Sequence, residues 1–181
     1  MRKEETNDKE KNPVWYIIMV FLILIIILMV IPYYGINKNP RPKKIISLAD
    51  AIRGLDLDGY KLDELDIRDL STDNLIIIAR RIARGCDDVD DVCYAKAFYY
   101  FVRDEIKYIP DPNFEFYESP GFTLKSGAAD CDGKAILLSA LLKTVDITSR
   151  IVLGNNHAYV QVYLPGALSI YKTEGDWVSL D

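Results

Sequence analysis

The chain has 181 residues, of which 22 are Lys or Arg and 27 are Asp or Glu, giving a formal net charge of -5 at pH 7. This length accommodates one domain of ordinary size and a short appendage. The first 13 residues carry as many basic as acidic side chains, so the negative charge belongs to the remainder. Such a chain offers no basic stripe to neutralise phosphates, and we expect no nucleic-acid partner.

An apolar segment follows the N-terminal tail (1–13). Residues 14–31 contain no charge, Gly or Pro, and a helix of this length is roughly 27 Å long, close to the thickness of a bilayer's hydrocarbon core. Aromatic residues border it on both sides: Trp15, Tyr16, Tyr33 and Tyr34. A signal peptide would have a shorter apolar core and a small-residue cleavage site, and a buried soluble helix is rarely so aliphatic. We predict an uncleaved transmembrane helix over residues 14–34, with the lipid bilayer as its partner.

A linker, residues 35–46, joins this anchor to a domain predicted over residues 47–181. Its Pro-containing basic sequence is expected to be extended and solvated. Basic residues are equally numerous on the two sides of the anchor, so the positive-inside count does not choose an orientation. They are Arg2, Lys3, Lys9 and Lys11 before it and Lys38, Arg41, Lys43 and Lys44 after it.

The domain begins with helical patterns. Residues 47–55 predict a short amphipathic turn, and an acidic stretch continues to Asp66. Residues 71–74 are typical of an N-cap cluster, and they precede a helix over residues 75–85. Four aspartates between positions 87 and 91 then open a second helix. Their spacing lacks the alternating ligands, central Gly and distal Glu of a calcium loop, so we interpret them as helix-capping carboxylates.

Cys86 and Cys93 flank these aspartates. On one continuous helix they would lie about 10 Å apart, too far to bond, but Gly85 and the aspartates supply a break. Two interpretations stay open: a local disulfide, or two unpaired thiols on separate helices. A disulfide would place the domain on the oxidising, extracytoplasmic face of the cell membrane, with a single-pass anchor running N-in and C-out.

The second helix is predicted over residues 88–108, ended by Pro110 and Pro112. A loop rich in turn formers follows, and then a helix whose positions 135–142 are almost all apolar, which predicts burial at the centre of a fold. After this helix, apolar and polar residues alternate with the two-residue period of β-strands. The strands are expected at residues 149–154, 157–164, 167–171 and 177–181. Helices followed by an antiparallel meander indicate the α+β class.

Cys131 begins the apolar helix and lies between Asp130 and Asp132. Two adjacent carboxylates disfavour a thiolate. A helix N-terminus and a nearby imidazolium favour it, and they would have to outweigh the carboxylates. His157, the chain's one histidine, begins a strand, and Asp181 ends the last strand. Taken singly, Cys131 is better explained as a small buried hydrophobe, and a lone histidine such as His157 is usually a surface or core residue.

Three blocks resemble those of the transglutaminase-like superfamily, relatives of the papain-like cysteine proteases. They are "GAADCDGKAILLSALLK", "NNHAYVQVYLPG" and "WVSLD", preceded by the helix "AKAFYYFVRDEIKYIPD". An anchor followed by such a domain also resembles an archaeal group of membrane-bound transglutaminase-like proteins. In the superfamily a cysteine leading a central helix is followed by a histidine and an aspartate on successive strands.

The resemblance implies that Cys131 is the nucleophile, His157 the general base and then acid, and Asp181 the residue that orients the imidazole. The backbone N–H of Cys131 would hold the oxyanion, with Tyr108 as a candidate second donor. Packing at a helix end is the alternative role of Tyr108. The family usually continues beyond this aspartate, so a carboxylate on the final residue is expected to fray.

The predicted function is a membrane-anchored thiol hydrolase or acyltransferase that cleaves or exchanges amide bonds of peptides or cell-envelope material through a thioester. Hydrolysis is favoured over transamidation because no amine-docking feature is visible. The alternative is a non-catalytic envelope-binding or assembly module that retains the fold. A redox role for Cys131 lacks a C-x-x-C motif. No metal-ligand spacing and no phosphate-cradling loop suggest a cofactor.

Overall fold

A computed structural model describes residues 13–57, 72–110 and 117–181. The N-terminal tail, the acidic stretch from residue 58 to Asp66 and Ser71 of the expected N-cap cluster lie outside these ranges. The chain forms two compact units, residues 1–37 and 38–181.

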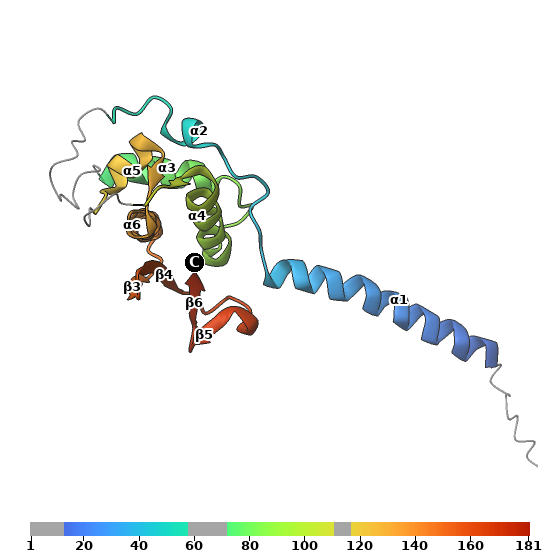
Figure 1. The fold of residues 1–181 in the computed structure, drawn as a ribbon. Coiled ribbons are helices and arrows are strands. Elements are labelled where there is room, and N and C mark those ends of the chain that lie inside the picture. Colours follow the sequence, from blue (N-terminus) through green and yellow to red (C-terminus); the bar gives the residue numbers. More distant parts are fainter. Residues whose placement is uncertain (1–12, 58–71, 111–116) are drawn as a thin grey trace, which may run out of the picture. The chain divides into compact units, whose positions relative to one another are not determined.

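The first unit contains helix α1 (Pro13–Lys38), drawn in blue in Figure 1. Its apolar stretch Pro13–Ile31 has a mean hydropathy of 3.3 and is not buried anywhere along its length. An unburied apolar surface of this size is not stable in water. The helix is therefore long and apolar enough to cross a membrane.

The second unit is an α+β domain, as predicted. Its helices are α2 (Leu48–Ile52), α3 (Thr72–Ala83), α4 (Asp91–Glu105), α5 (Pro120–Ser126) and α6 (Cys131–Lys143), with one 3₁₀ turn, η1 (Ser169–Tyr171). A two-stranded parallel ladder joins β1 (Lys107–Tyr108) to β2 (Ala128–Ala129). The antiparallel sheet has the order β3-β4-β6-β5 and consists of β3 (Ser149–Gly154), β4 (His157–Tyr163), β5 (Lys172–Glu174) and β6 (Trp177–Leu180).

Helix α6 lies at the centre of this domain, between the sheet and the other helices (Figure 1). Leu137, Leu141 and Leu142 on α6 are fully buried, and they pack in one core with Phe98 and Phe101 of α4. From the sheet, alternate residues of β4 point into the same core, as the alternating pattern predicted. The nearly uniform apolar composition of α6 is thus explained by contacts on opposite sides.

Three expected elements differ from the structure. The second helix ends at Glu105, short of the prolines, because residues 107–108 pair as a strand with β2. Residues 120–126, within the expected loop, form helix α5. Ser119 caps this helix, Pro120 occupies its first turn, and Gly127 ends it with φ of 67°. The strand expected at residues 167–171 is wrong, since a 3₁₀ turn stands there and β5 follows it.

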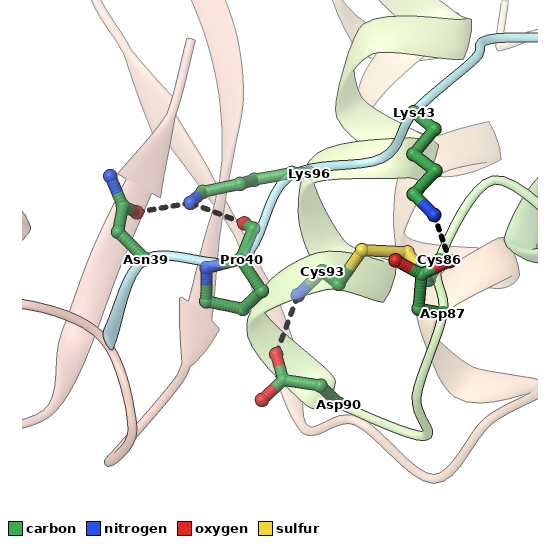
Figure 2. The surroundings of a disulfide bond; sticks show 8 residues. All are labelled: Asn39, Pro40, Lys43, Cys86, Asp87, Asp90, Cys93 and Lys96. Atoms are coloured by element: carbon green, nitrogen blue, oxygen red, sulfur yellow. Dashed lines mark hydrogen bonds and ion pairs between the residues drawn. A yellow bond between two sulfur atoms is a disulfide. The ribbon is translucent and has the colours of Figure 1, made fainter. Parts of the chain in front are cut away.

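Cys86 and Cys93 form a disulfide with their Cα atoms 6.0 Å apart, which confirms the first of the two interpretations (Figure 2). The loop between them makes the required break. Asp90 caps α4 by accepting a hydrogen bond of 2.8 Å from the Cys93 N–H. Asp90 and Asp91 therefore act at the start of α4, as predicted, whereas Asp87 pairs with Lys43.

The segment expected to be a solvated linker contacts the domain beside this disulfide (Figure 2). Lys96 of α4 donates hydrogen bonds to Asn39 Oδ1 and to the Pro40 carbonyl, and the Lys43 N–H donates to the Gly85 carbonyl at 2.7 Å. The Lys43 ammonium also pairs with Asp87 at 2.7 Å. Residues 39–43 are thus held against the disulfide-bonded loop.

Replacing both Cys86 and Cys93 with Ala should lower the free energy of unfolding by about 2 kcal/mol, because the crosslink no longer restricts the unfolded chain. Urea unfolding of the detergent-solubilised chain measures this through Trp177 fluorescence in a Trp15→Phe background. Dithiothreitol should reproduce the loss in the parent protein and should not affect the double variant. Equal unfolding midpoints for parent and double variant would contradict a structural role for the disulfide.

Candidate active site

Asp130 fixes the start of helix α6. Its Oδ1 accepts hydrogen bonds from the N–H groups of Asp132 at 3.0 Å and Gly133 at 3.2 Å. This cap makes Cys131 the first helical residue. Within the described part of the chain, the N–H of Cys131 has no acceptor, as is usual for the first turn of a helix. A backbone donor is thus free beside the sulfur atom.

Cys131 is half-buried and lines a pocket of about 150 Å³. The same pocket is bordered by His157 and Asp181 of the sheet and by Tyr108 of β1. Its remaining lining is largely apolar and aromatic. Three segments distant in sequence, whose residues the sequence analysis proposed as a triad, therefore meet at one pocket.

His157 and Asp181 are in direct contact. The imidazole Nε2 and Asp181 Oδ1 are 2.6 Å apart. Strands β4 and β6 are antiparallel neighbours in which Val160 pairs with Leu180, so continuing that register puts Asp181 opposite Tyr159, on the His157 side of the strand. The pairing of the two strands thus explains why these side chains meet.

Two tyrosines stabilise this pair. Tyr99 of α4 donates a hydrogen bond of 2.5 Å from its hydroxyl to the Asp181 backbone carbonyl. The ring of Tyr159 stacks on the His157 imidazole with 6.2 Å between ring centroids. Fraying of the terminal aspartate was expected, but the tie to α4 opposes it, although the Asp181 side chain remains 64% exposed.

The orientation of the His157 ring determines which of its nitrogens can accept a proton from Cys131. Because Nε2 faces a carboxylate, it carries the proton that it donates to Asp181. Nδ1 has no hydrogen-bond partner among the described residues and is left as the acceptor. No hydrogen bond joins it to the Cys131 thiol within the described part of the chain. Catalytic hydrogen bonds are often long before substrate binds, so shared lining of one pocket is compatible with proton transfer.

Tyr108 is placed next to the nucleophile by the β1–β2 ladder. Tyr108 pairs with Ala129, two residues before Cys131, and the neighbouring Ile109 N–H donates to the Ala129 carbonyl at 3.1 Å. Its side chain is 61% exposed and borders the pocket. Tyr108 therefore borders the pocket close to the nucleophile, and its role as the second oxyanion donor stays a prediction.

A buried carboxyl cluster lies under the thiol. Asp130, Asp132 and Glu118 are each 7% exposed. A Cβ added to Gly133 would lie 2.2 Å from Glu118 Oε2, so glycine is what allows Glu118 to approach the first turn of α6. Burial raises the pKa of Asp132 to about 7, and the adjacent charges of Asp130 and Glu118 add to the shift.

This arrangement removes the difficulty posed by two aspartates beside a thiol. The Asp130 charge is neutralised in part by the N–H groups that it caps. Asp132 remains protonated up to about pH 7. Near neutral pH only part of the expected repulsion therefore acts on a Cys131 thiolate.

Asp130, Cys131 and Asp132 also form a group whose potential metal ligands lie within 4.8 Å of one another. Asp130 Oδ1 is already used by the helix N–H groups. The three residues are consecutive, and Cys131 lines the pocket. We therefore interpret the group as a helix cap with a protonated neighbour and assign it no metal.

Two pocket residues were not predicted from the sequence. Tyr99 lies in the helix "AKAFYYFVRDEIKYIPD", and its contact with Asp181 joins two segments far apart in the chain. Lys134 also borders the pocket. Its spacing of three residues from Cys131 on a helix was a usable signal, because such residues share a face.

The chain belongs to the transglutaminase-like superfamily, whose family model matches residues 77–181. This match covers more than half of the chain and includes the segments of Cys131, His157 and Asp181. Neither the curated proteins nor the solved structures gave a match.

The variant Asp132→Asn should have a free energy of unfolding that depends less on pH than that of the parent protein. Folding raises the pKa of Asp132 to about 7, whereas its pKa in the unfolded chain is about 4. Protonated Asp132 therefore contributes its full stabilisation below pH 4. This contribution is lost as the pH rises through 7. Relative to the variant, the parent should lose on the order of 4 kcal/mol between pH 4 and 8.

Urea unfolding of parent and variant across this pH range, followed by Trp177 fluorescence, measures the difference. Asp88→Asn, at an exposed position on the disulfide loop, serves as the matched control and should follow the parent. A constant difference between Asp132→Asn and the parent at every pH would show that folding does not raise the pKa of Asp132.

Proposed function

We propose that this protein is a membrane-anchored thiol enzyme that cleaves or exchanges amide bonds of peptides or cell-envelope material. The observation that carries the proposal is the 2.6 Å contact between His157 and Asp181 at the pocket that Cys131 borders. A module that only binds would not need a thiol, an imidazole and a carboxylate at one pocket. Membership of the transglutaminase-like superfamily supports the same chemistry.

The reaction would begin with proton transfer from the Cys131 thiol to His157 Nδ1. The sulfur then attacks the amide carbon, and the carbonyl electrons move to oxygen. The Cys131 N–H holds this oxyanion, with the Tyr108 hydroxyl as the second donor. Asp181 holds the imidazolium through Nε2–H.

Collapse of this intermediate breaks the C–N bond. His157 gives its proton to the leaving amine, and a thioester remains on Cys131. Water, deprotonated by His157, would resolve the thioester to an acid, or a second amine would resolve it to a new amide. We propose hydrolysis, because Lys134 borders the pocket without an ion-pair partner among the described residues, and its positive charge repels a protonated amine.

The anchor and the disulfide support an extracytoplasmic domain. Helix α1 is long and apolar enough to span a bilayer, and a Cys86–Cys93 disulfide is typical of oxidising compartments. To test this orientation, free thiols are blocked in intact cells before lysis, and the state of Cys86 and Cys93 is then determined. Finding the two cysteines reduced would contradict an extracytoplasmic domain.

Alkylation by iodoacetamide at pH 6 tests the proposal, because Cys131 is the chain's one cysteine outside the disulfide. In the full chain without reductant, Cys131 should react about tenfold or more faster than N-acetylcysteine amide, since the thiolate is stabilised by the helix N-terminus and the imidazolium. His157→Ala should abolish most of this advantage.

Asn155→Ala, in the exposed turn between β3 and β4, is the matched control and should react like the parent. A Cys131 that reacts no faster than the free thiol, and is indifferent to His157→Ala, would favour the non-catalytic module.

A further inference from the structure

Lys134 lies one turn after Cys131 on helix α6. Its backbone N–H donates to the Asp130 carbonyl at 3.2 Å, within the first turn that the cap fixes. Positions three apart on a helix share a face, and both side chains border the same pocket. Lys134 and Cys131 therefore border the pocket from the same side of α6.

The Lys134 ammonium has no hydrogen-bond or ion-pair partner in the part of the chain that the structure describes. The lysine is half-buried, and this burial lowers its pKa. Asp104 is the acidic group whose charge acts on it, but the two do not form an ion pair. A partly desolvated cation without a partner costs free energy, and a bound anion would recover that cost.

The second cation at the pocket is already satisfied. Arg103 donates to both oxygens of Asp104, at 2.6 and 2.9 Å, and its guanidinium also lies over the Tyr100 ring, 4.9 Å from the centroid. The pocket's acidic group, Asp181, is hydrogen-bonded to His157. Among the charged side chains described at the pocket, Lys134 is the one left to meet a ligand.

We propose that Lys134 is a specificity residue that binds a carboxylate of the substrate, so that the amide presented to Cys131 belongs to an acidic molecule. This inference rests on the proposed function for the role of the amide, but the carboxylate site itself does not require catalysis. The carboxylate belongs either to an Asp or Glu side chain or to a free chain terminus. The remaining pocket lining, which is aromatic and aliphatic, contacts the apolar part of such a molecule.

Paired alkylating reagents test the carboxylate site directly. Iodoacetate and iodoacetamide deliver the same carbon to a thiolate with loss of iodide, and they differ in carrying a carboxylate or a neutral amide. Full-length protein in neutral detergent is reacted at pH 8.5, where unactivated thiols also react, and Cys131 modification is followed by mass. Lys134→Met should lower the iodoacetate-to-iodoacetamide rate ratio by about three- to fivefold.

Two controls separate charge recognition from damage to the fold. Lys134→Arg keeps the cation and should retain most of the ratio. Lys143→Met removes the same charge from an exposed position at the far end of α6 and should leave the ratio unchanged. The effect should weaken as salt is raised from about 0.05 to 0.5 M.

A His157→Ala background distinguishes failure of this inference from failure of the proposed function. The dependence of the ratio on Lys134 should persist there, because anion binding does not need the base. A ratio unchanged by Lys134→Met, or a loss equal for both reagents, overturns the carboxylate site whatever the reactivity of Cys131.

Protection of Cys131 from iodoacetamide identifies the source of the carboxylate. Blocked tripeptide amides with central Glu or Gln form one pair, and a blocked tripeptide as its free acid or amide forms the other. Preferential protection by the Glu peptide assigns the site to an acidic side chain, and preferential protection by the free acid assigns it to a terminus. Each preference should disappear in Lys134→Met.

Discussion

The hydrogen bonds from the first turn of α6 to the Asp130 carboxylate are the interaction on which the rest of the site depends. They begin the helix at Cys131 and leave the Cys131 N–H free. The buried body of the helix then fixes the sulfur atom relative to the sheet, because α6 packs against β3 and β4 on one side and α4 on another. A different start of the helix would rotate the thiol away from the pocket.

The same cap accounts for the unusual electrostatics of the site. Asp130 uses its charge on backbone N–H groups, and Asp132 is buried with its pKa raised to about 7. Of the two acidic side chains next to the thiol, Asp130 therefore caps the helix and Asp132 is buried. What remains on the pocket side is a cation, Lys134, which favours both a thiolate and an anionic ligand.

Much of this was predictable from the sequence, for identifiable reasons. The uniform apolar pattern at positions 135–142 required burial on several sides, and strict alternation after His157 required a strand with one face in the core; both are observed. Helix α5 was missed because Ser119, Pro120 and Gly127, which are typical of turns, also cap short helices. The direct β4–β6 pairing depends on long-range contacts that local patterns do not encode.

The site was predictable only in part. The order Cys131, His157 and Asp181 carried a family resemblance, but the contact between His157 Nε2 and Asp181 depends on the pairing of β4 with β6. The contact from Tyr99 to the last residue likewise joins positions 82 apart in sequence. Tertiary contacts of this kind become visible only when the sheet is packed on the helices.

In the proposed site the thiol and the imidazole act on each other, and the chain's single histidine makes this directly measurable. ¹⁵N NMR of His157 in parent and Cys131→Ala protein at neutral pH separates the two ring nitrogens. We predict that removing the thiol shifts the Nδ1 resonance, whereas Nε2 keeps its proton and its bond to Asp181. An Nδ1 resonance that is the same in both proteins, or a proton found on Nδ1 with Nε2 bare, would contradict it.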